Sequence, residues 1–232
     1  MLRGRLNIGA KIRQTLLAQD CVLCGEASGD TPLCAACHDD LPRVVDACPM
    51  CAGPSVAAKI CGACLTVSPS FDATLAVWRY EFPLDRLLQA LKYGGRLALA
   101  RAFGQALAAQ VATRRIDAIV PMPLAPARIA DRGFNQAIEI ARVVAERSGI
   151  AIASRIVQRV RNTLPQTDLP HDARAANVRG AFACTGTVVG MALAVIDDVM
   201  TTGATLEELA RTLKRAGAER VENWVVARTW PR

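Results

Sequence analysis

Aromatic residues are scarce in this 232-residue sequence, because Phe, Trp and Tyr together make up only 4% of it. This scarcity argues against an extensive surface on which nucleic-acid bases could stack. Long apolar runs are missing too: no window approaches the roughly 18 apolar residues of a membrane helix, so we expect no membrane insertion. The basic segment 1–20 lacks the long apolar core and small-residue cleavage site of a secretory signal. We therefore expect a cytoplasmic protein with a short basic N-terminal helix, and an Arg-rich transit peptide is the alternative.

The composition favours a folded and basic protein. Hydrophobic residues make up 52% of the chain and charged residues 21%, which permits a packed core and argues against global disorder. The length fits one α/β domain with room for a small second module. The formal net charge of +7 attracts phosphates, whether on a nucleotide or on a nucleic acid. A solvated Arg-rich surface would have the same net charge, so charge alone does not separate these interpretations.

Eight of the nine cysteines lie within residues 21–64, in two blocks that share the spacing C-x2-C-x9-C-x2-C. Two such pairs can place four thiolates around one tetrahedral zinc ion, and four thiolates leave no open position for water. The predicted zinc ions are therefore structural. A disulfide framework is the alternative, which the missing export signal disfavours. The simplest grouping is sequential: Cys21, Cys24, Cys34 and Cys37, then Cys48, Cys51, Cys61 and Cys64. An interleaved grouping, a single occupied site and His38 as a substitute ligand stay open.

The rest of the chain alternates between segments typical of strands and of helices. Strands are predicted at 72–81, 116–120, 154–161, 190–196 and 220–227, and helices at 84–94, 97–114, 134–149 and 205–217. This alternation predicts an α/β fold, a parallel sheet flanked by helices, preceded by the small Cys-rich module. The expected domains are a basic segment 1–20, a zinc module 21–66 and an α/β domain 72–232, with a linker at 65–71.

Two acidic residues follow an apolar run in the stretch "AVIDDVMTTGAT" at 194–205. We expect Asp197 and Asp198 to end the strand at the edge where open α/β sheets bind ligands. Thr205 and Glu208 match a capping box, so a helix should begin near Thr205. Gly203, the threonine hydroxyls and the helix N-terminus suit a phosphate, while the carboxylates suit vicinal hydroxyls. A ribose 5-phosphate carries both groups. A capping loop with two surface acids is the alternative.

This stretch resembles the phosphoribosyl pyrophosphate (PRPP) motif of type I phosphoribosyltransferases. The resemblance implies that the acidic pair Asp197 and Asp198 binds the ribose hydroxyls. It also implies that the following loop holds the 5-phosphate, and this loop comprises Val199, Met200, Thr201, Thr202, Gly203, Ala204 and Thr205. A magnesium ion would accompany PRPP.

The stretches "VPMPLAPARIADRGFNQA" and "TLPQTDLPHDARAANVRGAF", together with the paired cysteine blocks, resemble the ComF family of competence-associated proteins from about residue 21 to the end. The resemblance implies a pyrophosphate loop at Pro121, Met122 and Pro123, with Arg128 and Arg132 nearby. It implies a closing loop at 162–180, where Arg174 and Arg179 would contact pyrophosphate with Gln166 and Asn177 as polar support. Lys92 is a weaker candidate for such a contact. Each of these basic residues also fits a solvated surface.

Two functions follow from the resemblance, and the sequence leaves catalysis open. The first is a PRPP-binding or nucleotide-binding protein that helps to handle single-stranded DNA during natural transformation, with competence-machinery proteins as partners. The second is an active type I phosphoribosyltransferase in nucleotide metabolism or salvage. No acceptor site for a base is recognisable in the sequence.

Overall fold

The computed structural model describes residues 19–161 and 173–230. The chain divides into two compact units, Met1–Leu41 and Pro42–Arg232, so the boundary falls between the two cysteine blocks. In the first unit, β1 (Gln19–Asp20) pairs antiparallel with β2 (Ala27–Gly29), and α2 (Ala35–Asp39) follows.

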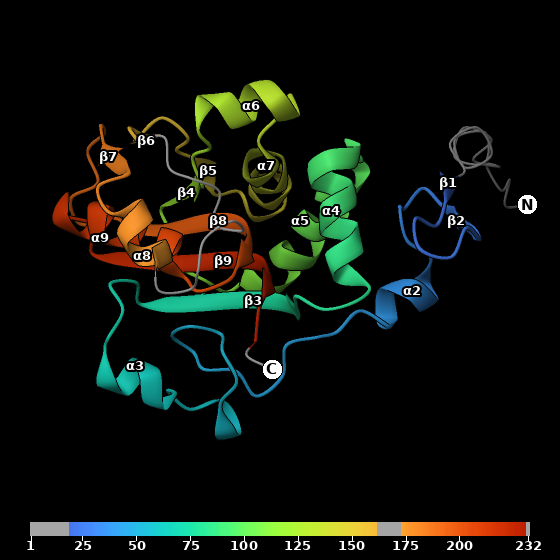
Figure 1. The fold of residues 1–232 in the computed structure, drawn as a ribbon, viewed down its shortest axis with the longest axis horizontal. Coiled ribbons are helices and arrows are strands. Elements are labelled where there is room, and N and C mark those ends of the chain that lie inside the picture. The colour runs from blue at the N-terminus through green and yellow to red at the C-terminus, as the bar shows by residue number, and fades with distance from the viewer. Residues whose placement is uncertain (1–18, 162–172, 231–232) are drawn as a thin grey trace, which may run out of the picture. The chain divides into compact units, whose positions relative to one another are not determined.

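The second unit begins with two short helical segments and continues as alternating strands and helices (Figure 1). Its helices are η1 (Val56–Ala58), α3 (Gly62–Thr66), α4 (Leu84–Gly94), α5 (Ala98–Val111), α6 (Pro126–Arg132), α7 (Gln136–Ser148), α8 (Ala173–Val178) and α9 (Ala204–Arg215). Its strands are β3 (Ala73–Arg79), β4 (Ala118–Pro121), β5 (Ala151–Ile152), β6 (Val157–Arg159), β7 (Phe182–Cys184), β8 (Ala192–Met200) and β9 (Arg220–Arg228). Within the described ranges, no helix has both the length and the apolar character that a membrane span requires.

Five strands form one parallel sheet in the order β3-β9-β8-β4-β5. The chain passes from β4 through α6 and α7 outward to β5, and from β8 through α9 outward to β9 in the opposite direction. The switch point therefore lies between β4 and β8, where an open parallel sheet forms a crevice at the carboxyl ends of its strands. Because such crossovers are right-handed, α7 and α9 cover opposite faces of the sheet.

Both faces of the sheet are packed, as expected for a buried parallel sheet. On one face, Leu206, Leu209 and Leu213 of α9 belong to the same buried cluster as Val195 of β8 and Val225 of β9. α8 lies beside α9, and α5 lies beside α7 (Figure 1). The ring of Trp78 in β3 meets that of Phe103 in α5 edge-on, at 5.8 Å between centroids.

The predicted α/β architecture is observed, with differences at element ends. The helix predicted at 84–94 has these bounds, and the strand predicted at 220–227 is β9. The segment 154–161 contributes only β6, which pairs antiparallel with β7 outside the main sheet. The linker predicted at 65–71 begins inside α3, which extends to Thr66. The helix α6 was not predicted, because its seven residues are too short to show a clear apolar repeat.

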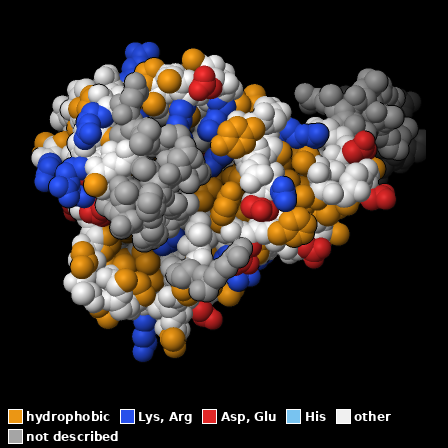
Figure 2. Space-filling model, in the orientation of Figure 1, with side chains coloured by type: hydrophobic (Ala, Val, Ile, Leu, Met, Phe, Trp, Pro, Cys, Tyr) orange, Lys and Arg blue, Asp and Glu red, His pale blue; other side chains and the backbone are white. Residues whose placement is uncertain are grey.

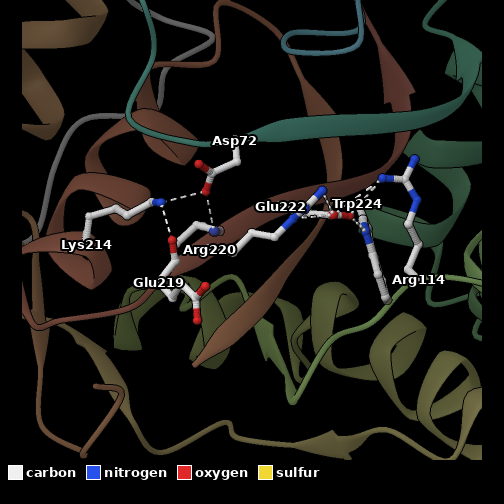
Figure 3. Close-up of polar contacts among 8 residues, drawn as sticks. Asp72, Arg114, Lys214, Glu219, Arg220, Glu222 and Trp224 are labelled. Atoms are coloured by element: carbon white, nitrogen blue, oxygen red, sulfur yellow. Dashed lines mark hydrogen bonds and ion pairs between the residues drawn. The ribbon is translucent and has the colours of Figure 1, made fainter. Parts of the chain in front are cut away.

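The start of β9 contains a buried carboxylate with three partners (Figure 3). Glu222 is 2% exposed, and it accepts hydrogen bonds from Trp224 Nε1 at 3.0 Å and from Arg220 Nε at 2.9 Å. Arg114, three residues beyond the end of α5, adds an ion pair at 3.3 Å. A buried charge needs such partners because its desolvation is costly. This network fixes the amino end of the sheet, opposite the end where the candidate site lies.

Candidate functional site

The candidate site begins where β8 continues beyond its neighbour β4. The pairing between the two strands reaches Pro121 opposite Ile196, and the amide of Met122 still donates to the Ile196 carbonyl at 2.8 Å. β8 then runs on to Met200, paired only with β9. The prediction that Asp197 and Asp198 end the strand is therefore wrong, because β9 carries the ladder past them. Asp197 and Asp198 do lie directly after the point where the pairing between β4 and β8 ends.

The acidic pair is held by its own backbone and by one lysine. Asp197 Oδ1 accepts from the amide of Asp198 at 2.9 Å, and Asp198 Oδ1 accepts from the amide of Val199 at 2.8 Å. The second oxygen of Asp198 lies 2.5 Å from the ammonium nitrogen of Lys92 in α4. Burial by itself lowers the pKa of Lys92, but the Asp198 carboxylate more than compensates, and the pKa lies above its ordinary value. Lys92 thus faces the acidic pair, as its counter-ion.

Asp197 is the member of the acidic pair with a raised pKa. Burial raises the pKa of Asp197 to about 8, and the adjacent charge of Asp198 adds to this effect. Asp197 is therefore mainly protonated in the free site at neutral pH.

The loop after β8 has the geometry of an anion site. Gly203 has φ +84° and caps α9, which has no side-chain capping hydrogen bond. At the start of α7, by contrast, the side chain of Asn135 accepts from the amides of Ala137 and Ile138. At the start of α9, the amide of Ala204 has a side-chain acceptor, Thr202 Oγ1 at 3.3 Å. The N-cap glycine leaves later first-turn amides for a ligand, and the helix dipole favours an anion there.

The predicted capping box is wrong. Gly203, not Thr205, occupies the N-cap position, so α9 begins one residue earlier than expected. Glu208 instead accepts from the amide of Gly180 at 2.8 Å and pairs with Arg211 at 3.3 Å. It therefore anchors the C-terminal end of the segment predicted to close over the site.

A cavity of about 740 Å³ lies over this edge of the sheet. Among the predicted residues, those that line it are Met122, Arg128, Arg132, Asp197, Asp198, Val199, Met200, Thr201, Gly203 and Thr205. Lys92 lines the cavity as well. The acidic pair and the phosphate loop, the two groups predicted to bind the ligand, thus face the same cavity. Four predicted residues are not in the cavity wall: Pro121, Pro123, Thr202 and Ala204. Thr202 instead accepts a hydrogen bond through Oγ1 from the amide of Ala204 at 3.3 Å.

Other residues in the cavity wall had no signal in the sequence. Arg159 in β6 is the main one: burial and then repulsion from Arg128 lower its pKa, while Asp197 raises it. Arg128 and Arg159 thus line the same cavity as the acidic pair. Tyr80, Tyr93 and Phe134 line the same cavity, and the Arg132 guanidinium lies 5.4 Å from the centroid of the Tyr93 ring. Isolated residues on four separate segments form no spacing pattern, which explains why sequence reasoning missed them.

The predicted pyrophosphate loop is held by α7. The side-chain amide of Asn135, which caps this helix, donates to the Met122 carbonyl at 3.0 Å. Arg132 donates to the side-chain oxygen of Gln136 at 2.7 Å. The stretch 133–136 thus ties the loop after β4 to the first turn of α7 and directs Arg132 along the cavity wall.

The predicted closing segment is described only at its ends. Gln166 lies outside the described residues, and so does the side chain of Arg174 in α8. Arg179 is exposed, and its carbonyl accepts a hydrogen bond from Arg161. Neither Arg179 nor Asn177 is in the cavity wall. The role of these residues in pyrophosphate contact stays a prediction.

The eight cysteines form two compact clusters, grouped in sequence order as Cys21, Cys24, Cys34 and Cys37, and as Cys48, Cys51, Cys61 and Cys64. All ligand atoms of a cluster lie within 4.8 Å of one another. Sulfur atoms of Cys24 and Cys34 are 3.8 Å apart, and those of Cys51 and Cys61 are 3.7 Å apart. A zinc tetrahedron with bonds of about 2.3 Å has sulfur–sulfur edges of about 3.8 Å, whereas a disulfide needs about 2.05 Å. The clusters fit structural zinc, with no disulfide among them.

The comparisons with known proteins agree with both parts of this description. Residues 12–65 match the family of double zinc ribbon domains, and residues 129–229 match the family of phosphoribosyl transferase domains. The chain is 34% identical to the DNA utilization protein YhgH of Salmonella typhimurium over 205 residues, which cover 85% of this chain and 90% of that protein. It is 32% identical to competence protein F of Haemophilus influenzae over 181 residues, 74% of this chain and 79% of that protein.

A solved structure of glutamine phosphoribosylpyrophosphate (PRPP) amidotransferase from B. subtilis, complexed with ADP and GMP, is 22% identical in sequence. The alignment covers 54% of this chain and 26% of that chain, with a TM-score of 0.38.

Proposed function

The chain belongs to the ComF family of competence-associated proteins, and from this premise we propose that it binds PRPP or a related ribose phosphate in the cavity over β4 and β8. One observation carries the proposal: the acidic pair and the start of α9, whose N-cap residue is a glycine, face the same cavity. The carboxylates accept hydrogen bonds from the ribose hydroxyls, while the amides after Gly203 donate to the 5-phosphate. A ligand that carried only one of these groups would leave half of the cavity wall unused.

The pyrophosphate would occupy the basic side of the cavity. Arg128 and Arg159 converge there, and guanidinium groups bind phosphate oxygens in a bidentate manner. Their mutual repulsion is relieved when an anion binds between them. Asp197, Asp198 and the arginines fit a PRPP–magnesium complex, in which the metal would neutralise pyrophosphate charge.

Calorimetry with PRPP and magnesium tests this proposal. We expect binding to the wild type and a loss of at least tenfold in affinity for Asp198→Asn, which removes a charged acceptor. Asp117→Asn is the matched control, because Asp117 lies at the amino end of the same sheet, where its carboxylate accepts from the Ala192 amide at 2.8 Å. Equal affinities for wild type and Asp198→Asn would rule out the proposed ligand geometry.

We further propose that the protein has an accessory role with single-stranded DNA in the cytoplasm, together with proteins of the competence machinery. The names of its relatives, DNA utilization protein and competence protein F, and the net charge of +7 support this role. Over β6, β7 and the end of α9, the charged groups seen in Figure 2 are mainly Lys and Arg side chains. With so few aromatic residues, contacts should be to phosphates. Binding to a single-stranded oligonucleotide should therefore weaken steeply between about 50 and 200 mM salt, and salt-independent binding would contradict it.

An active phosphoribosyltransferase is the second candidate. Tyr80, Tyr93 and Phe134 in the cavity wall favour it, because they offer apolar surface for a planar base beside the proposed ribose site. Release of pyrophosphate from PRPP should then depend on an added base and disappear in Asp198→Asn. Folded, PRPP-binding protein that releases none with any base of a panel would exclude this candidate.

A further inference from the structure

One guanidinium group joins the second cysteine cluster to the loop that carries the proposed phosphate site. Arg228 is the last residue of β9, and its Nε donates to the carbonyl of Cys51 at 2.9 Å. The other end of the same group donates to the carbonyl of Met200 at 3.1 Å and to that of Thr201. Cys51 belongs to the second cluster, and Thr201 lines the cavity. Both contacts lie within the compact unit Pro42–Arg232.

The surroundings of Arg228 favour a connection to the cluster. Among the ion pairs of the described residues, none joins Arg228 to a carboxylate. One zinc ion with four thiolates carries a formal charge of about −2, which supplies the counter-charge that a half-buried guanidinium requires.

Two more contacts hold the same module against this part of the sheet. Trp230 Nε1 donates to the carbonyl of Ala52, the residue after Cys51, at 2.9 Å. Ser70 in the linker after the cluster donates through its hydroxyl to Glu207 at 2.6 Å and through its amide at 2.8 Å. Glu207 lies in the first turn of α9, whose N-terminus faces the cavity. The second cluster and the linker after it are therefore hydrogen-bonded to the end of β9, which contacts the loop between β8 and α9, and to the first turn of α9, which follows that loop.

We propose that Arg228 is a positioning residue that couples metal occupancy of the second cysteine cluster to ribose-phosphate affinity at the loop between β8 and α9. With metal bound, the short turn that contains Cys51 would be rigid. The guanidinium of Arg228 then holds the carbonyls of Met200 and Thr201 in place. The amides that follow them then face the cavity before a ligand arrives, which lowers the ordering cost of binding. Without metal, this short turn has too little apolar surface to keep its conformation. This inference rests on the proposed PRPP site.

Coupling of this kind is reciprocal: if the metal raises the affinity for PRPP, then PRPP raises the retention of the metal by the same factor. If Arg228 had a purely structural role, its substitution would lower the stability of the protein, but PRPP would not change the retention of the metal. Arg228→Lys separates the two roles, because lysine keeps the charge but cannot bridge the four carbonyls of Cys51, Met200, Thr201 and Thr229 with a rigid set of donors.

The experiment compares wild type, Arg228→Lys, Cys51→Ser and the double variant, all as full chains. PRPP affinity is measured by calorimetry, and zinc release to a colorimetric chelator is followed with and without PRPP. We expect each single variant to weaken PRPP binding about five- to twentyfold and the double variant to be no weaker than either. PRPP should slow the release of one zinc ion from the wild type and not from Arg228→Lys. Arg220→Lys, at the other end of β9, is the matched control and should behave as the wild type.

The outcomes are distinct. Wild-type affinity in Arg228→Lys, additive losses in the double variant, or a rate of zinc release that PRPP does not change would each overturn the coupling while leaving the PRPP site intact. Absence of PRPP binding to zinc-loaded wild type would overturn the proposed function and the coupling with it. If Cys51→Ser does not fold, the zinc-release comparison between wild type and Arg228→Lys decides alone.

Discussion

Lys92 Nζ lies 2.5 Å from Asp198 Oδ2, and the side chains of both residues are largely buried, at 20% and 6% exposure. The pair joins α4 to β8 across the floor of the cavity. A ribose that approaches the acidic pair must therefore share Asp198 with an ammonium group that is already there. Lys92 supplies the counter-charge that offsets the cost of burying the Asp198 carboxylate in the free protein.

Removing Lys92 should destabilise the protein. Lys92→Met leaves the Asp198 carboxylate buried without its counter-ion, and breaking one partner of a buried pair costs roughly 3 to 5 kcal/mol. Urea unfolding monitored at neutral pH measures this change. The double variant Lys92→Met/Asp198→Asn should recover much of the loss, because no uncompensated charge then remains. A single variant as stable as wild type would show that the ion pair contributes nothing.

Affinity for PRPP should rise with pH up to about 8. Burial raises the pKa of Asp197 to about 8, so this carboxyl is protonated in the free site below that pH. The ribose hydroxyls donate to the ionised form, so binding below pH 8 releases a proton, and affinity increases by at most about tenfold per pH unit before it levels off. Calorimetry in two buffers of different ionisation enthalpy counts the protons.

Asp197→Asn is the control for this titration, since it retains the shape of the side chain but cannot ionise. The pH dependence of PRPP affinity in this variant should reflect only the ionisation of PRPP itself, and binding should release no proton from the protein at this position. Identical pH profiles for Asp197→Asn and wild type would refute the assignment of the titrating group.

Gly203→Ala should weaken PRPP binding about tenfold. Gly203 has φ +84°, a conformation that costs an L-residue roughly 1 to 2 kcal/mol, and an added Cβ would lie 2.6 Å from the terminal methyl of Met200. The loop should shift away from the conformation that presents its amides. Gly149→Ala is matched, because Gly149 has φ +75° at the end of α7 and an added Cβ meets nothing within 4 Å. Both variants should lose similar stability, and only the first should lose affinity.

The two cysteine clusters should contribute differently to the α/β unit. We expect two zinc ions per chain by atomic spectroscopy, and one in either Cys24→Ser or Cys51→Ser. Cys51 lies in the same compact unit as the sheet and Cys24 does not. Thermal unfolding of the sheet should therefore shift downward in Cys51→Ser and stay close to wild type in Cys24→Ser. Equal shifts in both variants would show that the clusters stabilise the sheet alike.

The sequence by itself determined the features that depend on local spacing. The repeated C-x2-C pairs predicted two four-cysteine clusters, because two residues between cysteines bring both sulfurs to one metal. The apolar run before Asp197 predicted a strand buried on both faces, and Leu193 to Ile196 are indeed fully buried. The loop 201–203 followed by a helix with apolar residues at helical spacing placed the proposed phosphate site at a strand end, where open sheets bind ligands.

Only the tertiary structure decided which distant residues meet. Lys92 opposite Asp198, Arg159 beside Arg128 and Arg228 between Cys51 and Thr201 come from segments with no sequence relation. The sequence placed the end of β8 too early, because the length of a strand depends on its partner β9 and not on its own residues. It also assigned Glu208 to a helix cap, whereas this carboxylate accepts a hydrogen bond from the amide of Gly180. Spacing along a chain encodes local geometry, but contacts between segments are fixed only when the sheet order and the packing of its helices bring those segments together.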